Sequence, residues 1–290
     1  MGDVALTIVI PTYNRGAIVV ETVRRLLQLQ PPAGGIVIVD QTVNATPELA
    51  LWHEQRAIRW IRLSHPSIPH AMNTGLLAAT TRLVLFLDDD VEPSAGIVAA
   101  HLEAHDDDAV WAVAGQILEL GESPMHYASP GEDLDFRFNH DQTRDVTNVM
   151  AGNLSVKRER ALAAGGFDEN FVGVAYRFET DFAHRLCAAG GRIRFEPRAS
   201  LRHLKLATGG LRTYGNHMTS PSPMHSVGDY YYAIVGGQPL FAYVLRRLRR
   251  NVVTRFHARH PWTVFSKLVG EMRGLALARR LAASGRKLLQ

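Results

Sequence analysis

The feature that most constrains the fold is a short, fully apolar run that ends in three consecutive aspartates. Residues Leu83–Leu87 read LVLFL, and Asp88, Asp89 and Asp90 follow directly. A five-residue apolar run bounded by polar residues is typical of a strand that is buried on both faces of a sheet. Such strands occur in parallel sheets, because helices cover both faces. The segment therefore predicts an α/β fold with carboxylates at the end of a central strand.

The rest of the first half alternates between strand and helix patterns. Strands are predicted at Leu6–Ile10, Ile36–Val39 and Ile58–Leu63, and helices at Ala17–Leu29 and Ala71–Ala79. This alternation predicts a mostly parallel central sheet flanked by helices, with right-handed crossovers. Ligands of such sheets bind outside the carboxyl ends of the strands. We therefore expect the functional site at the polar residues that follow the predicted strands.

The pattern of the second half is less regular. Strands are predicted at Trp111–Leu118 and Ile193–Phe195, and helices at Glu159–Ala164 and Thr180–Ala189. From about Leu240 the composition changes to that of basic amphipathic helices. The second half therefore predicts more α/β structure that is followed by a helical extension.

Charge is distributed unevenly along the chain. Residues 240–290 hold twelve Lys or Arg and one acid, Glu271, whereas the rest of the chain holds 20 bases and 27 acids. Between residues 240 and 256, apolar side chains recur at gaps of three and four, which predicts one apolar helical face. Such a helix either lies on an anionic membrane surface or packs its apolar face on the rest of the protein. We expect a catalytic domain at 1–215 and a basic amphipathic helical extension at 216–290.

The cysteine content and the N-terminus indicate the compartment. The chain contains one cysteine, Cys187, so no internal disulfide can form. The N-terminal residues lack the basic segment and cleavage site of a secretory signal, and no apolar stretch is long enough to span a bilayer. These features predict a cytoplasmic protein that is either free or peripheral on the inner face of the plasma membrane. No nucleic acid partner is expected, because no recognised binding module accompanies the bases.

The aspartate triplet is a candidate metal site. Three adjacent carboxylates repel one another, and a bound cation would neutralise them. On an extended segment Asp88 and Asp90 point the same way and can share a ligand. Hard cations such as Mn²⁺ and Mg²⁺ prefer oxygen ligands and often bridge to phosphate. The alternatives are a solvated acidic loop and a helix N-cap.

Three later segments carry further candidates. Glu179 and Asp181 lie at a predicted helix start, where they either cap the helix or act as a general base toward an acceptor hydroxyl. His203 either completes a metal shell with the carboxylates or belongs to the polar surface. Arg212 follows two glycines and either binds a diphosphate through its guanidinium or is an exposed turn residue.

In this order, the segments resemble the family 2 glycosyltransferases, which have a GT-A fold. The family's first strand and nucleotide-binding turn resemble the segment TIVIPTYNR, which implies donor contacts from Pro11, Thr12, Tyr13 and Arg15. Its second strand resembles IVIVDQT, where the final aspartate, here Asp40, meets the base or the ribose. The ordered set is more specific than any single segment.

The family's metal-binding D-x-D motif and the stretch before it resemble the segment IPHAMNTGLLAATTRLVLFLDDDVEP. The resemblance implies contacts of Asn73, Asp88 and Asp89 with the nucleotide-sugar donor, with Asp88 on the ribose side. It implies that Asp90 binds the metal, and that His203 is the family's late metal-ligand histidine.

The loop beneath the sugar and acceptor resembles the segment VMAGNLSVKRERALAAGGFDENF, with Gly152 and Asn153 at its turn. The acidic segment that supplies the base resembles RFETDFAHRL, which implies Glu179 as the first choice and Asp181 as the second. The family often has an arginine where this chain has Met72. A donor-phosphate contact is therefore either missing or supplied by Arg212.

The resemblance implies a metal-dependent enzyme that moves a sugar from a nucleotide-diphosphate donor to an acceptor hydroxyl, by single displacement with inversion. The acceptor would be a carbohydrate or a lipid-linked molecule, as in the synthesis of cell-surface polysaccharide or glycolipid. One alternative is a sugar nucleotidyltransferase, which should show a Gly-rich loop with a lysine after the first strand. Another is a non-catalytic nucleotide-sugar-binding scaffold. A dehydrogenase is disfavoured, because no G-x-G-x-x-G follows the first strand.

Overall fold

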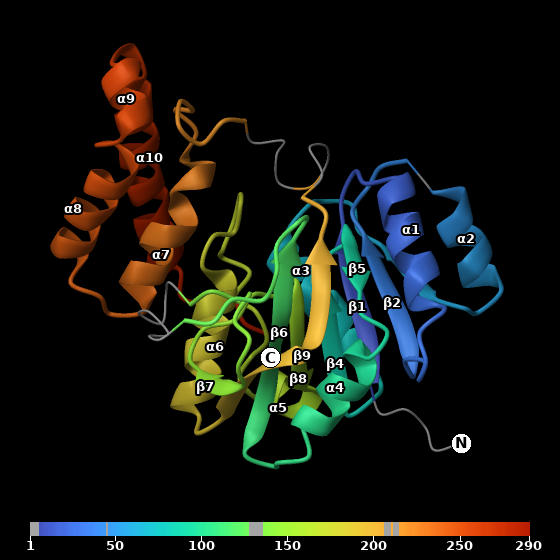
Figure 1. Ribbon diagram of the computed structural model, residues 1–290. Coiled ribbons are helices and arrows are strands. Elements are labelled where there is room, and N and C mark those ends of the chain that lie inside the picture. Colours follow the sequence, from blue (N-terminus) through green and yellow to red (C-terminus); the bar gives the residue numbers. More distant parts are fainter. Residues whose placement is uncertain (1–5, 45, 128–135, 206–209, 211–214) are drawn as a thin grey trace.

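The computed structural model of the protein describes residues 6–44, 46–127, 136–205, 210 and 215–290. In these residues a nine-stranded sheet carries helices on both faces (Figure 1). The strands are, in chain order, β1 (Leu6–Thr12), β2 (Gly35–Asp40), β3 (Arg59–Arg62), β4 (Leu83–Leu87), β5 (Val91–Pro93), β6 (Val110–Glu119), β7 (Arg144–Val146), β8 (Asn153–Lys157) and β9 (Arg192–His203). The helices are α1 (Ala17–Leu26), α2 (Pro47–Glu54), α3 (Ile68–Ala78), α4 (Ile97–Ala104), α5 (Arg158–Ala163), α6 (Phe178–Ala188), α7 (Val227–Val235), α8 (Leu240–Asn251), α9 (Arg255–Arg259) and α10 (Trp262–Ala283), with a 3-10 turn η3 (Pro223–His225).

The sheet is mostly parallel, as the sequence predicts. Its strand order is β3-β2-β1-β4-β8-β6-β9-β5, and β7 also pairs with β9. Strands β1 to β4 pair in parallel, β6 pairs in parallel with β9, and β8 runs antiparallel to both β4 and β6. The chain passes from β1 to β2 on one side and to β4 on the other. Such a switch point opens a crevice at the carboxyl ends of the strands.

Central strands are buried on both faces of this sheet. On β1, Ile8 and Ile10 belong to a hydrophobic cluster with α1, α2 and α4, whereas Val9 belongs to a cluster with α3 and α6. Phe86 of β4 lies in the second cluster, where its ring packs edge-on against Phe167 at 5.3 Å between centroids. Burying one such side chain stabilises the fold by about 1.5–3 kcal/mol. Burial on both faces explains why these strands are continuous apolar runs in the sequence.

Helices α7 to α10 form a group beside the sheet, next to α6 (Figure 1). Tyr231 of α7 and Ala278 of α10 are nevertheless buried in the same hydrophobic cluster as Phe182 of α6. After α10 the chain returns to the sheet, where the amide of Leu289 donates a hydrogen bond to the carbonyl of Gly165 at 2.8 Å. The extension therefore shares a core with the rest of the protein, and a domain boundary at residue 215 stays a prediction.

Most predicted elements are present with shifted ends. The strand Leu83–Leu87 has its predicted bounds, whereas the helix predicted at Ala71–Ala79 is α3, which begins at Ile68. It begins there because Ser67 caps it: the hydroxyl of Ser67 accepts a hydrogen bond from the amide of His70 at 3.4 Å.

Two predictions for the second half need correction. The strand predicted at Ile193–Phe195 is only part of β9, which continues to His203 because β6 and β5 pair along its length. The apolar pattern between residues 240 and 256 does not belong to one helix. Helix α8 ends at Asn251, and α9 starts after Thr254, whose hydroxyl accepts a hydrogen bond from the amide of His257 at 3.2 Å.

Candidate active site

A cavity of about 500 Å³ opens at the carboxyl ends of the central strands. Thr12 at the end of β1, Asp88–Asp90 after β4, Gly152 before β8, Glu179 of α6 and His203 of β9 all line it. Its volume is within the range of about 300–1,000 Å³ that is typical of small-molecule sites. The cavity is thus where the sheet topology places a ligand, and predicted residues from distant segments meet there.

A cluster of three side chains occupies one side of the cavity. Nε2 of His203 lies 3.1 Å from Oδ1 of Asp90 and 3.9 Å from Oδ2 of Asp88. One ligand atom from each of the three residues lies within 4.8 Å of the others. Two carboxylates and an imidazole at this spacing are compatible with a divalent cation.

Backbone pairing brings His203 to the aspartates. Strand β5 follows the triplet and pairs antiparallel with the end of β9, so that Val91 lies opposite His203. The amide of Leu204 then donates a hydrogen bond to the carbonyl of Asp90 at 2.9 Å. The pKa of His203 is raised, mainly by the hydrogen bond to Asp90, although partial burial lowers it. The length of β9 therefore decides whether the histidine reaches the cluster.

Asp89 is held by the end of β1. Its carboxylate accepts a hydrogen bond from the hydroxyl of Thr12 at 2.7 Å and pairs with Nε of Arg15 at 3.1 Å. Nη2 of Arg15 also lies 3.4 Å from Oδ2 of Asp90. Burial raises the pKa of Asp89 to about 7, and the effects of Arg15 and Thr12 only partly oppose it. Arg15 thus joins two members of the triplet and fixes their orientation.

Gly152 leaves room for the side chain of Asp88. A Cβ atom at position 152 would lie 2.3 Å from Oδ2 of Asp88, so a larger residue would displace this carboxylate. Asp88 opens onto the cavity. Desolvation by the surrounding protein raises the pKa of its carboxyl group. The charge of His203 lowers this pKa, and the charge of Asp90 raises it. A cation beside these groups would favour the ionised carboxylate.

Two acidic residues of α6 have different surroundings. Glu179, in the first helical turn, lines the cavity, and burial together with the charge of Asp88 raises its pKa to about 7. Asp181 points elsewhere, since its carboxylate pairs with Arg185 at 2.9 Å and with Arg286 at 2.6 Å. A carboxylate whose pKa is near neutrality suits a general base, whereas one in two ion pairs does not.

Asp40 and Asn73 do not line the cavity. The carboxylate of Asp40 accepts hydrogen bonds from the amide of Thr42 at 2.8 Å and from the indole of Trp60 at 3.3 Å. The side-chain amide of Asn73 donates to the carbonyl and accepts from the amide of Phe167, both at 2.8 Å. These side chains hold the chain in place around the site, and their predicted donor contacts stay predictions.

Asn153 is also absent from the cavity wall. Its side chain is fully buried, shares a hydrogen bond with Nε2 of His101 at 2.9 Å, and donates to the carbonyls of Gln116 and Ala199 at 3.0 and 2.8 Å. The amide is thus used within the sheet, and the predicted donor contact of Asn153 stays a prediction. Arg212 lies outside the described residues.

Arg177 and the aromatic wall of the cavity were not predicted from the sequence. Arg177 directly precedes α6, has a φ of 73° and is only 9% exposed. Phe136 and Phe138 line the cavity from the segment before β7 and pack edge-on at 5.1 Å between centroids. Arg177 begins the segment RFETDFAHRL, but the resemblance gives it no role, and the two phenylalanines lie outside any motif, so only the fold reveals their place.

Comparison with known proteins identifies the family. The family whose sequence model matches is described as Glycosyl transferase family 2, and the match covers residues 7–161, more than half of the chain. The chain belongs to glycosyl transferase family 2. Membership confirms the resemblance seen in the sequence and the enzyme class expected from it, a glycosyltransferase.

Curated relatives are similar over part of their length. A pre-mycofactocin glycosyltransferase of Mycobacterium tuberculosis (strain ATCC 25618 / H37Rv) is 34% identical over 139 residues, which are 46% of this chain and 29% of the relative. The uncharacterized protein y4gI of Sinorhizobium fredii is 26% identical over 233 residues, which are 72% of this chain and 25% of the relative. The chain thus matches less than a third of the length of either relative.

Solved structures share the fold at low sequence identity. The mannosyltransferase PcManGT from Pyrobaculum calidifontis, in complex with GDP-Man and Mn²⁺, has a TM-score of 0.56 and 18% identity, covering 97% of this chain and 79% of that one. TarS of S. aureus, in complex with UDP-GlcNAc, has a TM-score of 0.64 and 13% identity, covering 96% and 83%. These likenesses confirm the predicted GT-A type of fold with C-terminal helices.

Within the part of the chain that the structure describes, no helix combines the length and the apolar character needed to cross a bilayer.

Proposed function

We propose that the protein transfers a sugar from a nucleotide-diphosphate donor to an acceptor hydroxyl, in a metal-dependent reaction that inverts the anomeric carbon. One observation carries the proposal: a three-residue ligand cluster and a carboxylate with a pKa of about 7 face the same cavity. Family membership supports the reaction class. The nucleotide sugars bound to the similar structures, GDP-Man and UDP-GlcNAc, support the class of donor.

Asp90 and His203 are the proposed metal ligands, with Asp88 beside them on the donor side. Their donor set fits Mn²⁺ or Mg²⁺, because carboxylate oxygens are preferred by both ions. When bound, such an ion neutralises charge that develops on the leaving diphosphate. Arg15 supports the site by holding Asp89 at 3.1 Å and Asp90 at 3.4 Å, so that the carboxylates are oriented before the ion arrives.

Glu179 is the proposed general base. Its carboxylate takes the proton of the acceptor hydroxyl while the hydroxyl oxygen forms a bond to the anomeric carbon. The bond between that carbon and the diphosphate oxygen breaks in the same step, which inverts the carbon. General-base action of this kind is worth about 10²–10⁴-fold in rate. Asp181 is the second candidate, although its ion pairs with Arg185 and Arg286 oppose the role.

The end of β1 is the proposed contact surface for the donor. Pro11, Thr12, Tyr13 and Arg15 line the cavity together with Asp88, Asp89 and Gly152. Polar and backbone groups at the carboxyl ends of parallel strands are where nucleotides bind in folds of this kind. A contact of Arg212 with the donor phosphates rests on the sequence resemblance alone.

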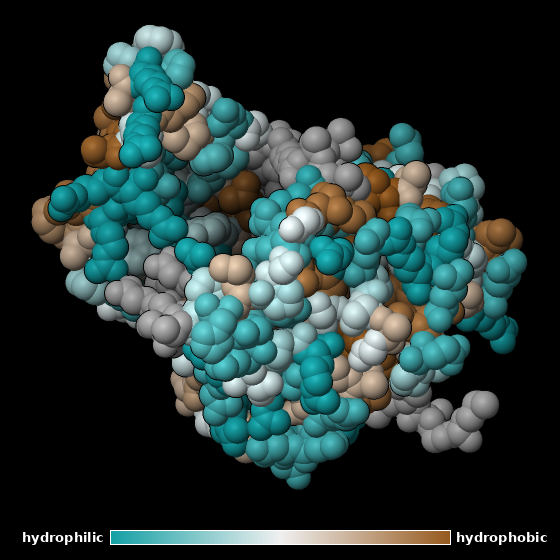
Figure 2. All heavy atoms as spheres, viewed as in Figure 1, coloured by the Kyte–Doolittle hydropathy of each residue, from teal (hydrophilic) through white to brown (hydrophobic). Residues whose placement is uncertain are grey.

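We further propose a carbohydrate or lipid-linked acceptor and peripheral association with the inner face of the plasma membrane. Helix α8 supports this, because Phe241 is 84% exposed while Arg247 of the same helix is buried. On α10, Trp262 and Phe265 are also exposed. Figure 2 shows brown apolar patches among teal hydrophilic surface on this helical group, at the upper left. Exposed apolar side chains between basic ones suit the interface of an anionic membrane.

A thermal-shift screen of nucleotide sugars with and without Mn²⁺, followed by a transfer assay, tests the proposal. We expect one nucleotide sugar to raise the melting temperature only when Mn²⁺ is present, because a ligand that binds the folded state stabilises it. The same donor should then give a glycosylated product. Release of diphosphate from a nucleoside triphosphate and a sugar phosphate would instead identify a nucleotidyltransferase. Donor binding without transfer to any of a panel of acceptors would identify a scaffold.

A further inference from the structure

A second pocket, of about 350 Å³, lies between the helical extension and the segment before α6. Val174, Tyr176 and Arg177 line both this pocket and the candidate active-site cavity, so the two are neighbours. Arg177 precedes the proposed base Glu179 by two residues. A group that binds in the second pocket therefore lies next to the part of the candidate active-site cavity that contains Glu179.

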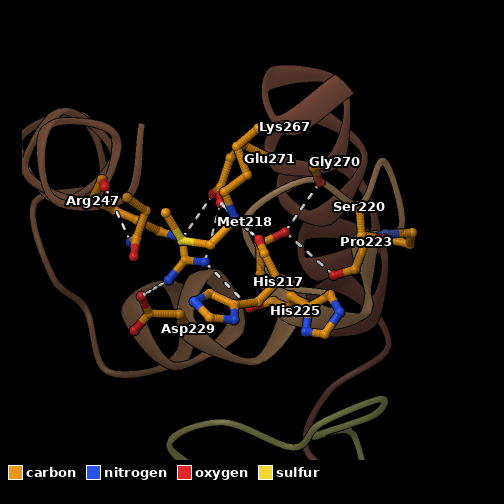
Figure 3. A network of polar contacts seen from close by, with 12 residues as sticks. His217, Met218, Ser220, Pro223, His225, Asp229, Arg247, Lys267, Gly270 and Glu271 are labelled. Atoms are coloured by element: carbon orange, nitrogen blue, oxygen red, sulfur yellow. Dashed lines mark hydrogen bonds and ion pairs between the residues drawn. The ribbon is translucent and has the colours of Figure 1, made fainter. Parts of the chain in front are cut away.

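A buried network builds the wall of this pocket (Figure 3). Arg247 is held by two acids: it pairs with Asp229, and its Nε lies 2.8 Å from Oε2 of Glu271. Nζ of Lys267 lies 2.9 Å from Oε1 of Glu271 and donates to the carbonyl of His217 at 3.0 Å. Because these side chains are buried and paired, this wall of the pocket is held in place by its own contacts.

The pocket carries an excess of positive charge. Five bases line it, namely Arg177, Arg246, Arg247, Arg250 and Lys267. The carboxylates next to them are Asp229 in the wall and Glu271 behind it, and both pair with Arg247. Two negative charges therefore face five positive ones.

Three of the guanidinium groups have unused hydrogen-bonding capacity. Arg246 and Arg250 are exposed one helical turn apart on α8, and in the described ranges no hydrogen bond or ion pair of theirs is found. Arg177 is 9% exposed and forms an ion pair with Asp229 at 3.6 Å, yet within the described residues its Nε has no hydrogen-bond partner. Buried donors without partners are rare, and a bound anion would satisfy this one.

We propose that this pocket binds a phosphate group of the sugar acceptor. The inference rests on the proposed glycosyltransferase function and adds the chemical class of the acceptor to it. Several guanidinium groups with unused hydrogen-bonding capacity match a group with multiple oxygens and more than one negative charge. A single carboxylate would leave part of this charge without a partner. Held there, the phosphate places the rest of the acceptor toward Glu179.

The phosphate can come from a soluble acceptor or from a lipid-linked one. Phe241 and Leu245 are exposed on the same helix, α8, that supplies Arg246 and Arg250. A lipid source would use both sets of side chains, whereas a soluble source would use only the arginines. The two sources are therefore distinguished by comparing the binding of the protein to inorganic phosphate with its binding to phosphatidylcholine vesicles that contain or lack phosphatidic acid.

Histidine proton resonances provide a local test of phosphate binding. His217 and His225 line the pocket, with ring centroids 6.4 Å apart, and the pKa of His217 is lowered by burial and by the charges of Lys267 and His225. A bound anion favours the charged imidazolium, so it should raise the pKa of His217. The titration uses the full chain and inorganic phosphate in metal-free buffer with EDTA, at constant ionic strength.

The variant to compare is Arg246→Gln with Arg250→Gln. The matched control is Arg249→Gln with Arg259→Gln, which removes the same charge at exposed positions outside the pocket. We expect saturable shifts of the His217 and His225 signals in the wild type and the control, and at least tenfold weaker phosphate binding in the pocket variant. Binding of nucleotide sugar with Mn²⁺ should be equal in all three proteins.

Three results would overturn the inference. They are the absence of saturable shifts in the wild type, equal phosphate affinity in the pocket variant, and loss of nucleotide-sugar binding in that variant, which would make the pocket part of the donor site. A wild type that binds phosphate but no nucleotide sugar would overturn the proposed function and the acceptor assignment together. Failure of the phosphate titration alone overturns only the inference.

Discussion

At the scale of single residues, the environments of two carboxylates on α6 decide their chemistry. Glu179 faces the cavity near Asp88 and has a pKa of about 7, whereas Asp181 is paired with Arg185 and Arg286. Both residues fit the acidic segment of the family in sequence, and spacing alone leaves the choice open. Burial and counter-charges favour Glu179, and both depend on contacts with distant parts of the chain.

Replacing Glu179 by Gln removes the proposed base but keeps the size and most hydrogen bonds of the side chain. Turnover should fall by about 10²–10⁴-fold, while the affinity for the donor changes little. The measurement is kcat in a transfer assay together with donor binding by calorimetry. Glu159→Gln, an exposed position on α5, is the control. Normal turnover in Glu179→Gln would move the base role to Asp181.

The raised pKa of Glu179 also predicts the pH dependence of transfer. The base acts only when it is deprotonated, so kcat/KM should rise with pH through about pH 7 and level off above it. Below that pH the slope should approach a factor of ten per pH unit. A profile of kcat/KM that stays flat as the pH falls well below this value would argue against a base with this pKa.

At the scale of elements, the C-terminal segment after α10 binds two buried aspartates behind the candidate active site. Arg286 reaches back to Asp168 at 3.3 Å and to Asp181 at 2.6 Å, and the amide of Lys287 donates to Asp168 at 3.0 Å. The segment thereby fixes α6, which carries Glu179. The sequence places this arginine only in the basic helical extension, because its two acidic partners lie more than 100 residues earlier in the chain.

Replacing Arg286 by Gln should therefore reduce stability. It leaves two largely buried carboxylates without their shared cation, which costs about 1–3 kcal/mol of unfolding free energy when the pair is partly accessible to water. Urea unfolding measures the loss. Arg280→Gln, at an exposed position of α10, should behave as the wild type. Equal stability of the two variants would show that the contact with Asp181 contributes nothing measurable.

Strand lengths show what the sequence predicts and what it does not. The two-sided burial of β1, β2 and β4 leaves apolar runs, so these strands and the acidic site after β4 are predictable. Strand β9 reads RIRFEPRASLRH. Because it contains many charged residues and Pro197, only Ile193–Phe195 is recognisable as a strand from the sequence. It is a strand because β6 and β5 pair with it, and such pairing is visible only in the fold. The meeting of His203 with the triplet could therefore be inferred only from the family resemblance.

At the scale of the whole molecule, the basic extension shares a hydrophobic core with the sheet. Tyr231 and Ala278 pack into the cluster of the sheet, while α8 contacts the protein through Tyr243, Val244 and Arg247 and leaves Phe241 exposed. The sequence predicts the amphipathic face but not its orientation, because a polar network competes with the apolar side chains for the interior. Removing residues 240–290 would disrupt the core, so membrane binding must be tested with point substitutions.

Substituting Phe241 and Phe265 by Ser should weaken co-sedimentation with anionic vesicles. Each substitution removes the favourable free energy of transferring an exposed aromatic side chain from water into the membrane interface, while the fold keeps its buried contacts. The control is Leu51→Ser with Leu77→Ser, which removes exposed apolar side chains from α2 and α3. Equal sedimentation of both double variants would remove the membrane proposal, since neither apolar face would then matter.

The most direct test of the central claim is anomalous diffraction from crystals soaked with Mn²⁺ and the nucleotide sugar found in the screen. The account predicts an anomalous peak bound by Asp90 and His203, next to Asp88, with the donor diphosphate at the same ion and Glu179 facing the sugar. A peak elsewhere, or a bound donor whose diphosphate lies away from Asp90, would contradict it.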